Sequence, residues 1–300
     1  IFLRTLHDKL SLLKIMLKSF FSPDISEWTE TLEHLLPKDV LFISHLLNKS
    51  QIENQADSYY GDLPQKLNEN GHLSLTALLN HTRVLSVHFS EEQTNENICR
   101  VVFPQNLGFF NELKHLKLLF EESRTLRKSA KSEKHKLKKN ILFQASIEAL
   151  SPDSMNSMRL ASLIKALVNK TKAKVLIATH EGHSWERLAF YSARQANSSV
   201  KCIGYLHAPL YKKQHAIKRN LAKYYNPDII YTSGYVQKNQ LDRTESLKNI
   251  PIEVLGTNRC FDDVAKSDDL RSETRNNGFR KKTCLVIPSG YESEIQLDLP

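Results

Sequence analysis

The chain has 300 residues, with 42 Lys and Arg against 33 Asp and Glu, which gives a formal net charge of +9 at neutral pH. Hydrophobic residues make up 40% and charged residues 25%, so the chain can bury a core and a wholly disordered protein is excluded. Nine Gly and ten Pro exclude a collagen-like chain. The longest apolar stretch, Leu10 to Phe21, is interrupted by Lys14 and Lys18, which excludes a membrane-spanning helix there.

The first hundred residues contain a helical region and three short apolar runs. Residues 38–47 and 98–103 are apolar runs typical of buried strands, and residues 71–79 alternate as a strand does. Residues 1–36 are predicted to be helical because apolar side chains recur at three- and four-residue spacing. These apolar positions are Leu6, Leu10, Leu13, Leu17 and Phe20.

Residues 106–150 form a long predicted helical region that carries most of the positive charge. Between Arg124 and Lys139 there are eight Lys and Arg and one acidic residue, Glu133. This pattern fits either a solvated helical face or a surface for a phosphate-bearing partner or an anionic membrane. No aromatic residues are interleaved with the charges and no nucleic-acid-binding motif occurs, so no nucleic-acid partner is predicted.

From residue 153 the chain alternates between helices and strands of four to seven residues. This alternation predicts an α/β fold with a doubly wound parallel sheet and flanking helices. The predicted strands are residues 174–179, 200–206, 228–232 and 252–255. The predicted helices are residues 154–170, 185–196, about 211–223 and 235–241.

The domain prediction places an N-terminal Rossmann-like domain at residues 1–256 and a linker at 257–282. Residues 283–300 are predicted to begin a second Rossmann-like domain. Because the chain begins at Ile1 and ends at Pro300, shortly after a predicted strand, we expect it to be part of a longer protein.

Ligands of open parallel sheets bind at the carboxyl ends of the strands, where loops and helix N-termini converge. Glu181 and His207 each follow a predicted strand, so we expect them at one edge of the sheet as an acid or base and a charge-stabilising group. A helix-dipole role for Glu181 and a structural role for His207 are the alternatives. Ser184 is predicted as a helix N-cap, and Ser233 and Gly234 could give backbone amides to an anion.

Several common catalytic motifs are missing from these loops. His180 and His183 are three residues apart with a glycine between them, whereas the zincin pattern needs histidines four apart, so no metal site is predicted. The chain also has no GxGxxG, GxxxxGK[ST] or GxSxG motif, which argues against a nicotinamide enzyme, a P-loop NTPase and an α/β-hydrolase.

Several segments together resemble a family of bacterial surface-carbohydrate biosynthesis proteins that is similar to two-domain GT-B glycosyltransferases. DVLFISHLLN is followed by YYGDLP (Tyr59 to Pro64), in which Tyr60 replaces the Trp of the family motif. EGHSWERLAF (Glu181 to Phe190) and IGYLHAPL (Ile203 to Leu210) resemble two further motifs. LVIPSGYESEIQL (Leu285 to Leu297) resembles the opening of the second domain.

This resemblance implies a glycosyltransferase that moves a sugar from a nucleotide-activated donor to a glycan or lipid-linked acceptor in O-antigen or capsule assembly. It implies a metal-independent reaction with no cofactor besides the donor, the acceptor lying mainly on the first domain. Glu181 and His207 are the predicted catalytic residues. The predicted substrate-binding residues are Tyr60, Gly61, His183, Trp185, Glu186, Arg187, Ser233, Gly234, Ser289 and Gly290.

Two other functions remain open from the sequence. A sugar-nucleotide epimerase can share the architecture, and a non-catalytic scaffold could dock through the basic helical region. The four cysteines, which lie at least 24 positions apart, favour a reducing compartment. The predicted location is therefore the cytoplasm, with the inner face of the membrane as a peripheral site. The cysteines are Cys99, Cys202, Cys260 and Cys284.

Overall fold

The structure is a computed structural model that describes residues 2–22, 24–32, 37–48, 51, 57–82, 99–211 and 214–257. These residues belong to the first of two compact units, Ile1–Arg259. Apart from residue 257, the predicted linker and second domain lie outside the described residues, and so do Ser289 and Gly290.

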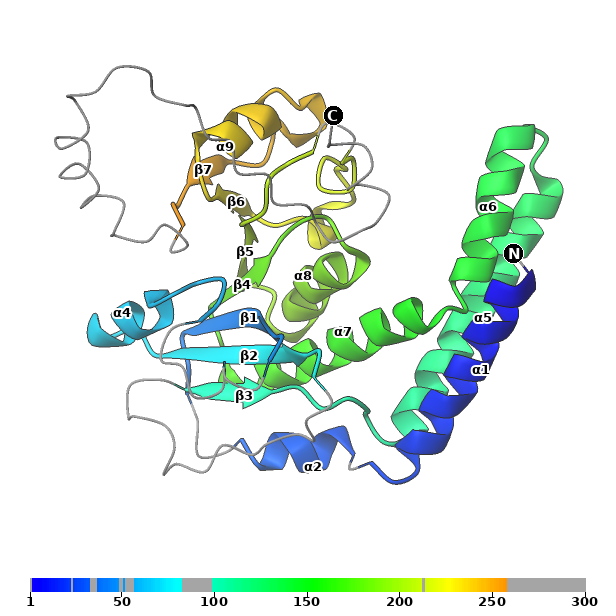
Figure 1. Ribbon diagram of the computed structural model, residues 1–300, viewed down its shortest axis with the longest axis horizontal. Helices are drawn as coiled ribbons and strands as arrows, with labels where there is room; N and C mark the ends of the chain where they lie inside the picture. Colours follow the sequence, from blue (N-terminus) through cyan, green and yellow to red (C-terminus); the bar gives the residue numbers. More distant parts are fainter. Residues whose placement is uncertain are drawn as a thin grey trace, which may run out of the picture. The chain divides into compact units, whose positions relative to one another are not determined.

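Seven parallel strands form a single sheet, which confirms the predicted parallel α/β architecture (Figure 1). The strand order is β3-β2-β1-β4-β5-β6-β7. The central strands are almost wholly buried and rich in Leu, Ile and Val, as expected when both faces are covered. The strands are β1 (Val40–Leu46), β2 (Ser74–Asn80), β3 (Arg100–Val102), β4 (Val175–Thr179), β5 (Lys201–Leu206), β6 (Ile229–Thr232) and β7 (Ile252–Val254).

The chain changes direction across the sheet between β1 and β4. It runs outward from β1 through β2 to β3, and then returns to place β4 against the other side of β1, with Val40 opposite Val175. The connections after β1 and β4 therefore run to opposite faces of the sheet, to α4 (Leu63–Glu69) on one face and to α8 (Ser184–Ala196) on the other. This switch point is where a ligand site is expected.

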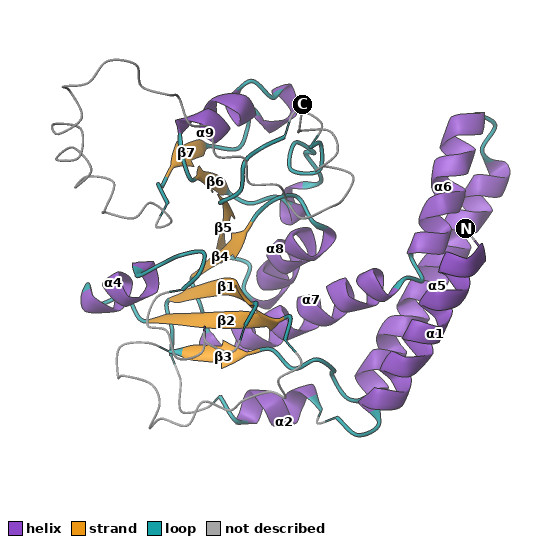
Figure 2. Ribbon diagram, in the orientation of Figure 1, coloured by secondary structure: helices purple, strands orange, loops and turns teal. Residues whose placement is uncertain are grey.

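Helices cover both faces of the sheet (Figure 2). On one face, α2 (Ile25–Glu30), α7 (Pro152–Thr171) and α8 (Ser184–Ala196) enclose the main hydrophobic core, and α9 (Tyr235–Asp242) packs near β6 and β7. On the other face, α4 (Leu63–Glu69) and its preceding loop pack on a smaller cluster that includes Phe42, Tyr60 and Tyr205.

Three further helices lie side by side and form what we call the helical arm (Figure 1). They are α1 (Phe2–Ser19), α5 (Phe109–Ser132) and α6 (Lys136–Glu148). The arm is joined to the sheet through α7, where the buried Arg159 donates to both carboxylate oxygens of Glu112 on α5 at 2.6 and 3.3 Å. No helix among the described residues is both long enough and apolar enough to cross a membrane.

The apolar stripe that predicts α1 does not face the core. The exposed fractions of Leu10, Leu13, Leu17 and Phe20 are 59%, 56%, 57% and 59%. Leu12 makes the buried contact instead, against a cluster on α5 and α7. The apolar periodicity therefore predicted the helix correctly, but the most apolar face of this helix is exposed to solvent.

The predicted helix at about 211–223 is wrong for the residues described there. Residues 214–222 form turns, followed by a short 3-10 helix, Lys223–Tyr225; a second one is Glu245–Leu247. The buried Arg187 guanidinium donates to the carbonyl oxygens of Ala216, Ile217 and Arg219 at 3.3, 3.4 and 2.9 Å. Because this side chain takes the carbonyls that a helix would use internally, the segment is held in a non-helical path.

Candidate functional site

The carboxyl ends of β1, β4 and β5 bring a cluster of ionisable and aromatic side chains to the switch point. Glu181 lies in the loop after β4, His207 directly follows β5, and His45 lies near the end of β1. Parallel pairing of the three strands fixes these positions, because Ile43 of β1 lies opposite Ala178 of β4. Residues far apart in sequence therefore share one edge of the sheet.

Glu181 contacts two histidines with its two carboxylate oxygens. Its Oε1 lies 3.6 Å from Nε2 of His207, and its Oε2 lies 3.4 Å from Nε2 of His183. The His207 side chain is 14% exposed and the His183 side chain 60%, so the first contact is interior and the second lies at the rim. A hydrogen bond from His183 lowers the pKa of Glu181 and raises that of His183. Glu181 is therefore ionised at neutral pH.

Glu186 holds the loop that carries Glu181. Its buried carboxylate accepts the backbone N–H groups of Glu181, Gly182 and His183 at 3.0, 2.7 and 2.8 Å. The N-cap of α8 is His183, so the prediction of Ser184 as the cap is wrong by one residue. The first turn of α8 thereby fixes the backbone on either side of the Glu181 side chain.

Only glycine fits between Glu181 and His183. Gly182 has φ +88, which L-residues rarely adopt. A Cβ built at this position would lie 2.2 Å from the carbonyl carbon of Ala216. The tight packing against Ala216 explains why a glycine stands between Glu181 and His183.

Sequence reasoning missed His45 and His81. Nδ1 of His45 lies 2.8 Å from Nε2 of His81, and Nε2 of His45 lies 3.2 Å from the Thr179 hydroxyl. The signal that could have found His45 is its place near the carboxyl end of the first strand, the criterion that selected Glu181 and His207. His81 follows β2 and gave no motif of its own.

Burial, followed by repulsion from His81, lowers the pKa of His45 from 6.5 to about 4. Below about pH 6.5, His45 is protonated in the unfolded chain but stays neutral in the folded protein. The free energy of unfolding therefore decreases as the pH falls from about 6.5 toward 4. At about 1.4 kcal/mol per pH unit, protonation of His45 in the unfolded chain lowers the free energy of unfolding by roughly 2 to 3 kcal/mol between pH 6.5 and 4.5. We expect His45→Gln to abolish that share, as measured by urea unfolding at about pH 7 and pH 4.5.

The exposed His72 provides the control for the removal of a histidine, since His72→Gln should unfold at about pH 7 at the same urea concentration as the parent. Equal loss of stability on acidification in the parent and in His45→Gln would contradict the prediction.

The Tyr59-Tyr60-Gly61 segment is built on the buried Asp57. Its Oδ1 accepts the backbone N–H groups of Tyr59 and Tyr60 at 2.8 and 3.0 Å. The Tyr60 hydroxyl donates to the Ile43 carbonyl at 3.0 Å, and burial raises the pKa of Tyr60. Gly61 has φ +60, which closes the turn. Tyr60 therefore shapes the wall of the site from a buried position.

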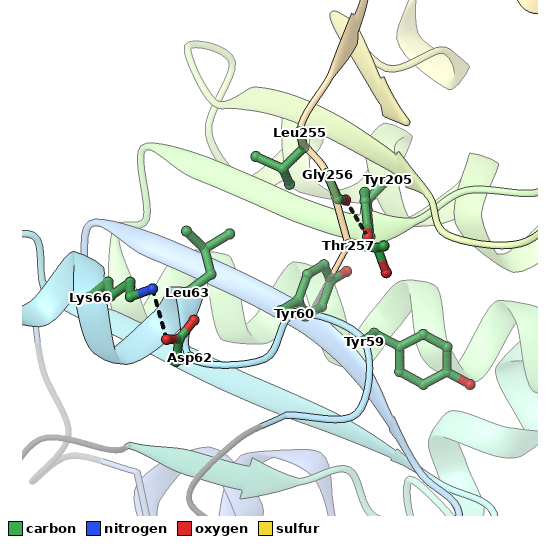
Figure 3. A pocket seen from close by; sticks show the side chains of 9 residues that line it. All are labelled: Tyr59, Tyr60, Asp62, Leu63, Lys66, Tyr205, Leu255, Gly256 and Thr257. Carbon is green, nitrogen blue, oxygen red and sulfur yellow. Dashed lines mark hydrogen bonds and ion pairs between the residues drawn. The ribbon is translucent and has the colours of Figure 1, made fainter. Parts of the chain in front are cut away.

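Two cavities approach the cluster from different sides. The first, of about 360 Å³, is lined on one side by Tyr59 and Tyr60, whose rings extend in different directions (Figure 3). The ring centroid of Tyr59 lies 4.6 Å from that of His207 and 5.1 Å from that of His45. The remaining lining residues are Asp62, Leu63, Lys66, Tyr205, Leu255, Gly256 and Thr257.

The second cavity, of about 280 Å³, has His45 and Trp185 in its wall. Their rings meet edge-on with centroids 5.6 Å apart. Tyr59 thus connects the first cavity to His207, and His45 connects the second cavity to the same cluster. The other lining residues are Leu79, Asn80, His81, Phe103, Pro104, Gln105, Asn156, Arg159 and Leu160.

Other predicted site residues lie away from the two cavities. Arg187 is buried, and besides its contacts with the 216–219 carbonyls it donates to Asn226 Oδ1 at 2.8 Å. Ser233 and Gly234 follow β6, where the Ser233 hydroxyl accepts from Gln237 at 2.9 Å and Gly234 begins α9. Neither residue lines either of the two cavities; Glu181 and His207 do not line them either, but His207 contacts the lining residue Tyr59. The described residues contain no group of three His, Cys, Asp or Glu side chains able to hold a metal ion.

Comparisons with known proteins do not assign this chain to a family. No protein-family model matches the chain, and no curated protein matches it. Among solved structures it is similar to alpha,alpha-trehalose 6-phosphate synthase from Burkholderia multivorans, with 8% identity and a TM-score of 0.38. The similarity covers 80% of this chain and 53% of that one, so the chain spans about half the length of the structure it matches.

Proposed function

We propose that this chain carries the acceptor-binding domain of a glycosyltransferase that uses a nucleotide-activated sugar. The observation that carries the proposal is the 3.6 Å contact between Glu181 and His207 at the switch point of the sheet. The resemblance of the Tyr59 to Pro64 and Glu181 to Phe190 segments to surface-carbohydrate biosynthesis proteins supports the same function. We propose a glycan acceptor carried on a lipid, and a cytoplasmic reaction.

Sugar transfer needs a group that takes up the proton of the acceptor hydroxyl. The hydroxyl oxygen forms a bond to the anomeric carbon, and the bond from that carbon to the donor phosphate breaks with its electron pair left on the phosphate oxygen. We assign the proton to Nε2 of His207, because the Glu181 carboxylate 3.6 Å from that nitrogen stabilises the imidazolium that forms. Glu181 then acts as a positioning residue, itself oriented by His183.

The opposite assignment makes Glu181 the base and places His207 against the leaving phosphate. The 3.6 Å contact between Glu181 and His207 supports this assignment less well. The two side chains are in direct contact, whereas in an inverting transfer the acceptor oxygen and the leaving oxygen lie on opposite sides of the anomeric carbon. Both assignments place the reaction beside Tyr59 and use no metal ligand of this chain. We propose that cationic groups stabilise the leaving phosphate.

A ligand screen with the full-length protein tests this function. We expect one nucleotide sugar to raise the melting temperature, because a ligand that binds only the folded state stabilises it by mass action. With that donor, release of the nucleotide should depend on added glycan acceptor. A protein that neither binds nucleotide sugars nor releases nucleotide in their presence would contradict the proposal.

The same screen separates the two other functions. Interconversion of the nucleotide sugar without any acceptor would identify an epimerase. A non-catalytic scaffold in glycan assembly predicts that no nucleotide binds at all.

A further inference from the structure

Large apolar side chains that are exposed to solvent are concentrated on the helical arm. Of twenty such side chains among the described residues, twelve belong to α1, α5, α6 and the turn after α1. Apolar surface of this extent on one set of neighbouring helices indicates an interaction surface. The twelve are Leu10, Leu13, Leu17, Phe20, Phe21, Phe110, Leu113, Leu118, Phe120, Leu137, Ile141 and Phe143.

On α1 the exposed apolar stripe has lysines beside it. Leu10, Leu13 and Leu17 follow one another at three- and four-residue spacing, so they share one face of the helix. Lys9, Lys14 and Lys18 are also exposed and are next to them in sequence, whereas Leu12 faces the buried cluster. The open side of α1 therefore combines apolar and cationic groups.

One exposed stripe of α5 has the same combination. Leu113 and Phe120 are 44% and 54% exposed and are separated by the exposed Lys117. The same three- and four-residue spacing continues toward the hairpin through exposed cations only. These cations are Arg124, Arg127 and Lys131.

The end of the α5–α6 hairpin carries the densest charge in the chain. Residues 124–139 hold eight Lys and Arg and a single acidic residue, Glu133. Leu137 and Ile141, one turn apart on α6, are 62% and 58% exposed beside these cations. An occupant of this surface must therefore accept apolar groups and positive charge together.

We propose that the helical arm binds the surface of an anionic phospholipid bilayer. The headgroup phosphates would face the Lys and Arg side chains, and Leu137, Ile141 and their apolar neighbours would enter the boundary between headgroups and acyl chains. A second copy of the chain fits this surface less well, because it would bring the same excess of positive charge against itself. A nucleic acid would satisfy the cations but leave the apolar side chains in water.

This inference rests on the arm alone and stands whether or not the chain transfers sugars. It would hold any lipid-linked acceptor and the switch-point site at the same membrane. Vesicle binding can be measured without a sugar donor or acceptor, so its failure and the failure of the proposed function are distinguishable.

Vesicle sedimentation with the full-length protein tests the proposal. We expect binding to phosphatidylcholine vesicles that contain roughly 30% phosphatidylglycerol, little binding to pure phosphatidylcholine, and weakening as salt rises from about 0.1 to 0.5 M. Each lysine near such a surface contributes about fivefold, so K131E/K134E/K138E should weaken binding roughly 100-fold or more. L137Q/I141Q should weaken it roughly tenfold while keeping the salt dependence.

A second triple variant controls for net charge. Lys165, Lys201 and Lys223 are exposed outside the arm, and K165E/K201E/K223E changes the charge by the same amount. We expect it to bind as the parent does, and all variants should melt as the parent does because the changed side chains are exposed.

Three results would overturn the proposal. They are failure of the parent to bind anionic vesicles at low salt, equal loss of binding in the control triple variant, and a dimer in solution that L13Q/L17Q converts to a monomer without vesicle binding by either form. The last result would identify a second copy as the occupant.

Discussion

His207→Ala and Glu181→Gln are each expected to lower the rate of sugar transfer by about 100- to 10,000-fold, the usual effect of losing a positioned acid or base. The first change removes the proposed proton acceptor. The second leaves a neutral amide 3.6 Å from His207 and so withdraws the charge that stabilises its protonated form. Transfer is measured as nucleotide release that depends on acceptor, with proteins whose melting temperatures match the parent.

Coupling between the two residues distinguishes this mechanism from two separate structural effects. The double variant should lose little more activity than His207→Ala alone, because Glu181 acts through His207. Added imidazole should restore part of the activity of His207→Ala and none of that of Glu181→Gln. The exposed Glu253 gives the control variant Glu253→Gln, which should transfer at the parent rate. Activity within a few-fold of the parent in both single variants would refute the assignment.

Gly182→Ala is expected to destabilise the fold by about 3 to 5 kcal/mol and to reduce activity in the fraction that folds. The new methyl group would have to occupy the position 2.2 Å from the carbonyl carbon of Ala216 at a backbone φ of +88. Relief of this overlap must move either the loop at residue 216 or the backbone of Glu181. Urea unfolding measures the loss of stability.

Gly71→Ala separates the two causes of that loss. Gly71 has φ +82 with no atom within 4 Å of an added Cβ, so its substitution reports the backbone cost alone. We expect about 1 kcal/mol there. Equal effects at Gly71 and Gly182 would show that the packing against Ala216 is not rigid.

The strand pattern of the second half made the sheet predictable from sequence. Short buried runs such as residues 174–179 and 200–206 leave few alternatives to parallel βαβ units, and the carboxyl-end rule then selects Glu181 and His207 as neighbours. What could not be predicted is which strands are adjacent. His45 joins the cluster because β1 pairs with β4, a contact between residues more than 130 positions apart.

Local patterns failed where a distant side chain decided the outcome. The 211–223 segment has helical composition, yet the guanidinium of Arg187 takes its carbonyl groups. The spacing of Leu10, Leu13 and Leu17 identifies a helix but cannot say which face is buried, because α1 contacts its neighbours through Leu12. In both cases the missing information is a tertiary contact.

The internal cap at the start of α8 also limits which chemical groups this corner of the sheet can receive. In many parallel sheets the free amides at such a helix start attract a phosphate. Here the amides of Glu181, Gly182 and His183 already point at the carboxylate of Glu186. An arriving phosphate meets a negative charge instead of open donors. Because the Glu186 carboxylate already accepts these backbone amides, a phosphate has to be bound by other parts of the protein.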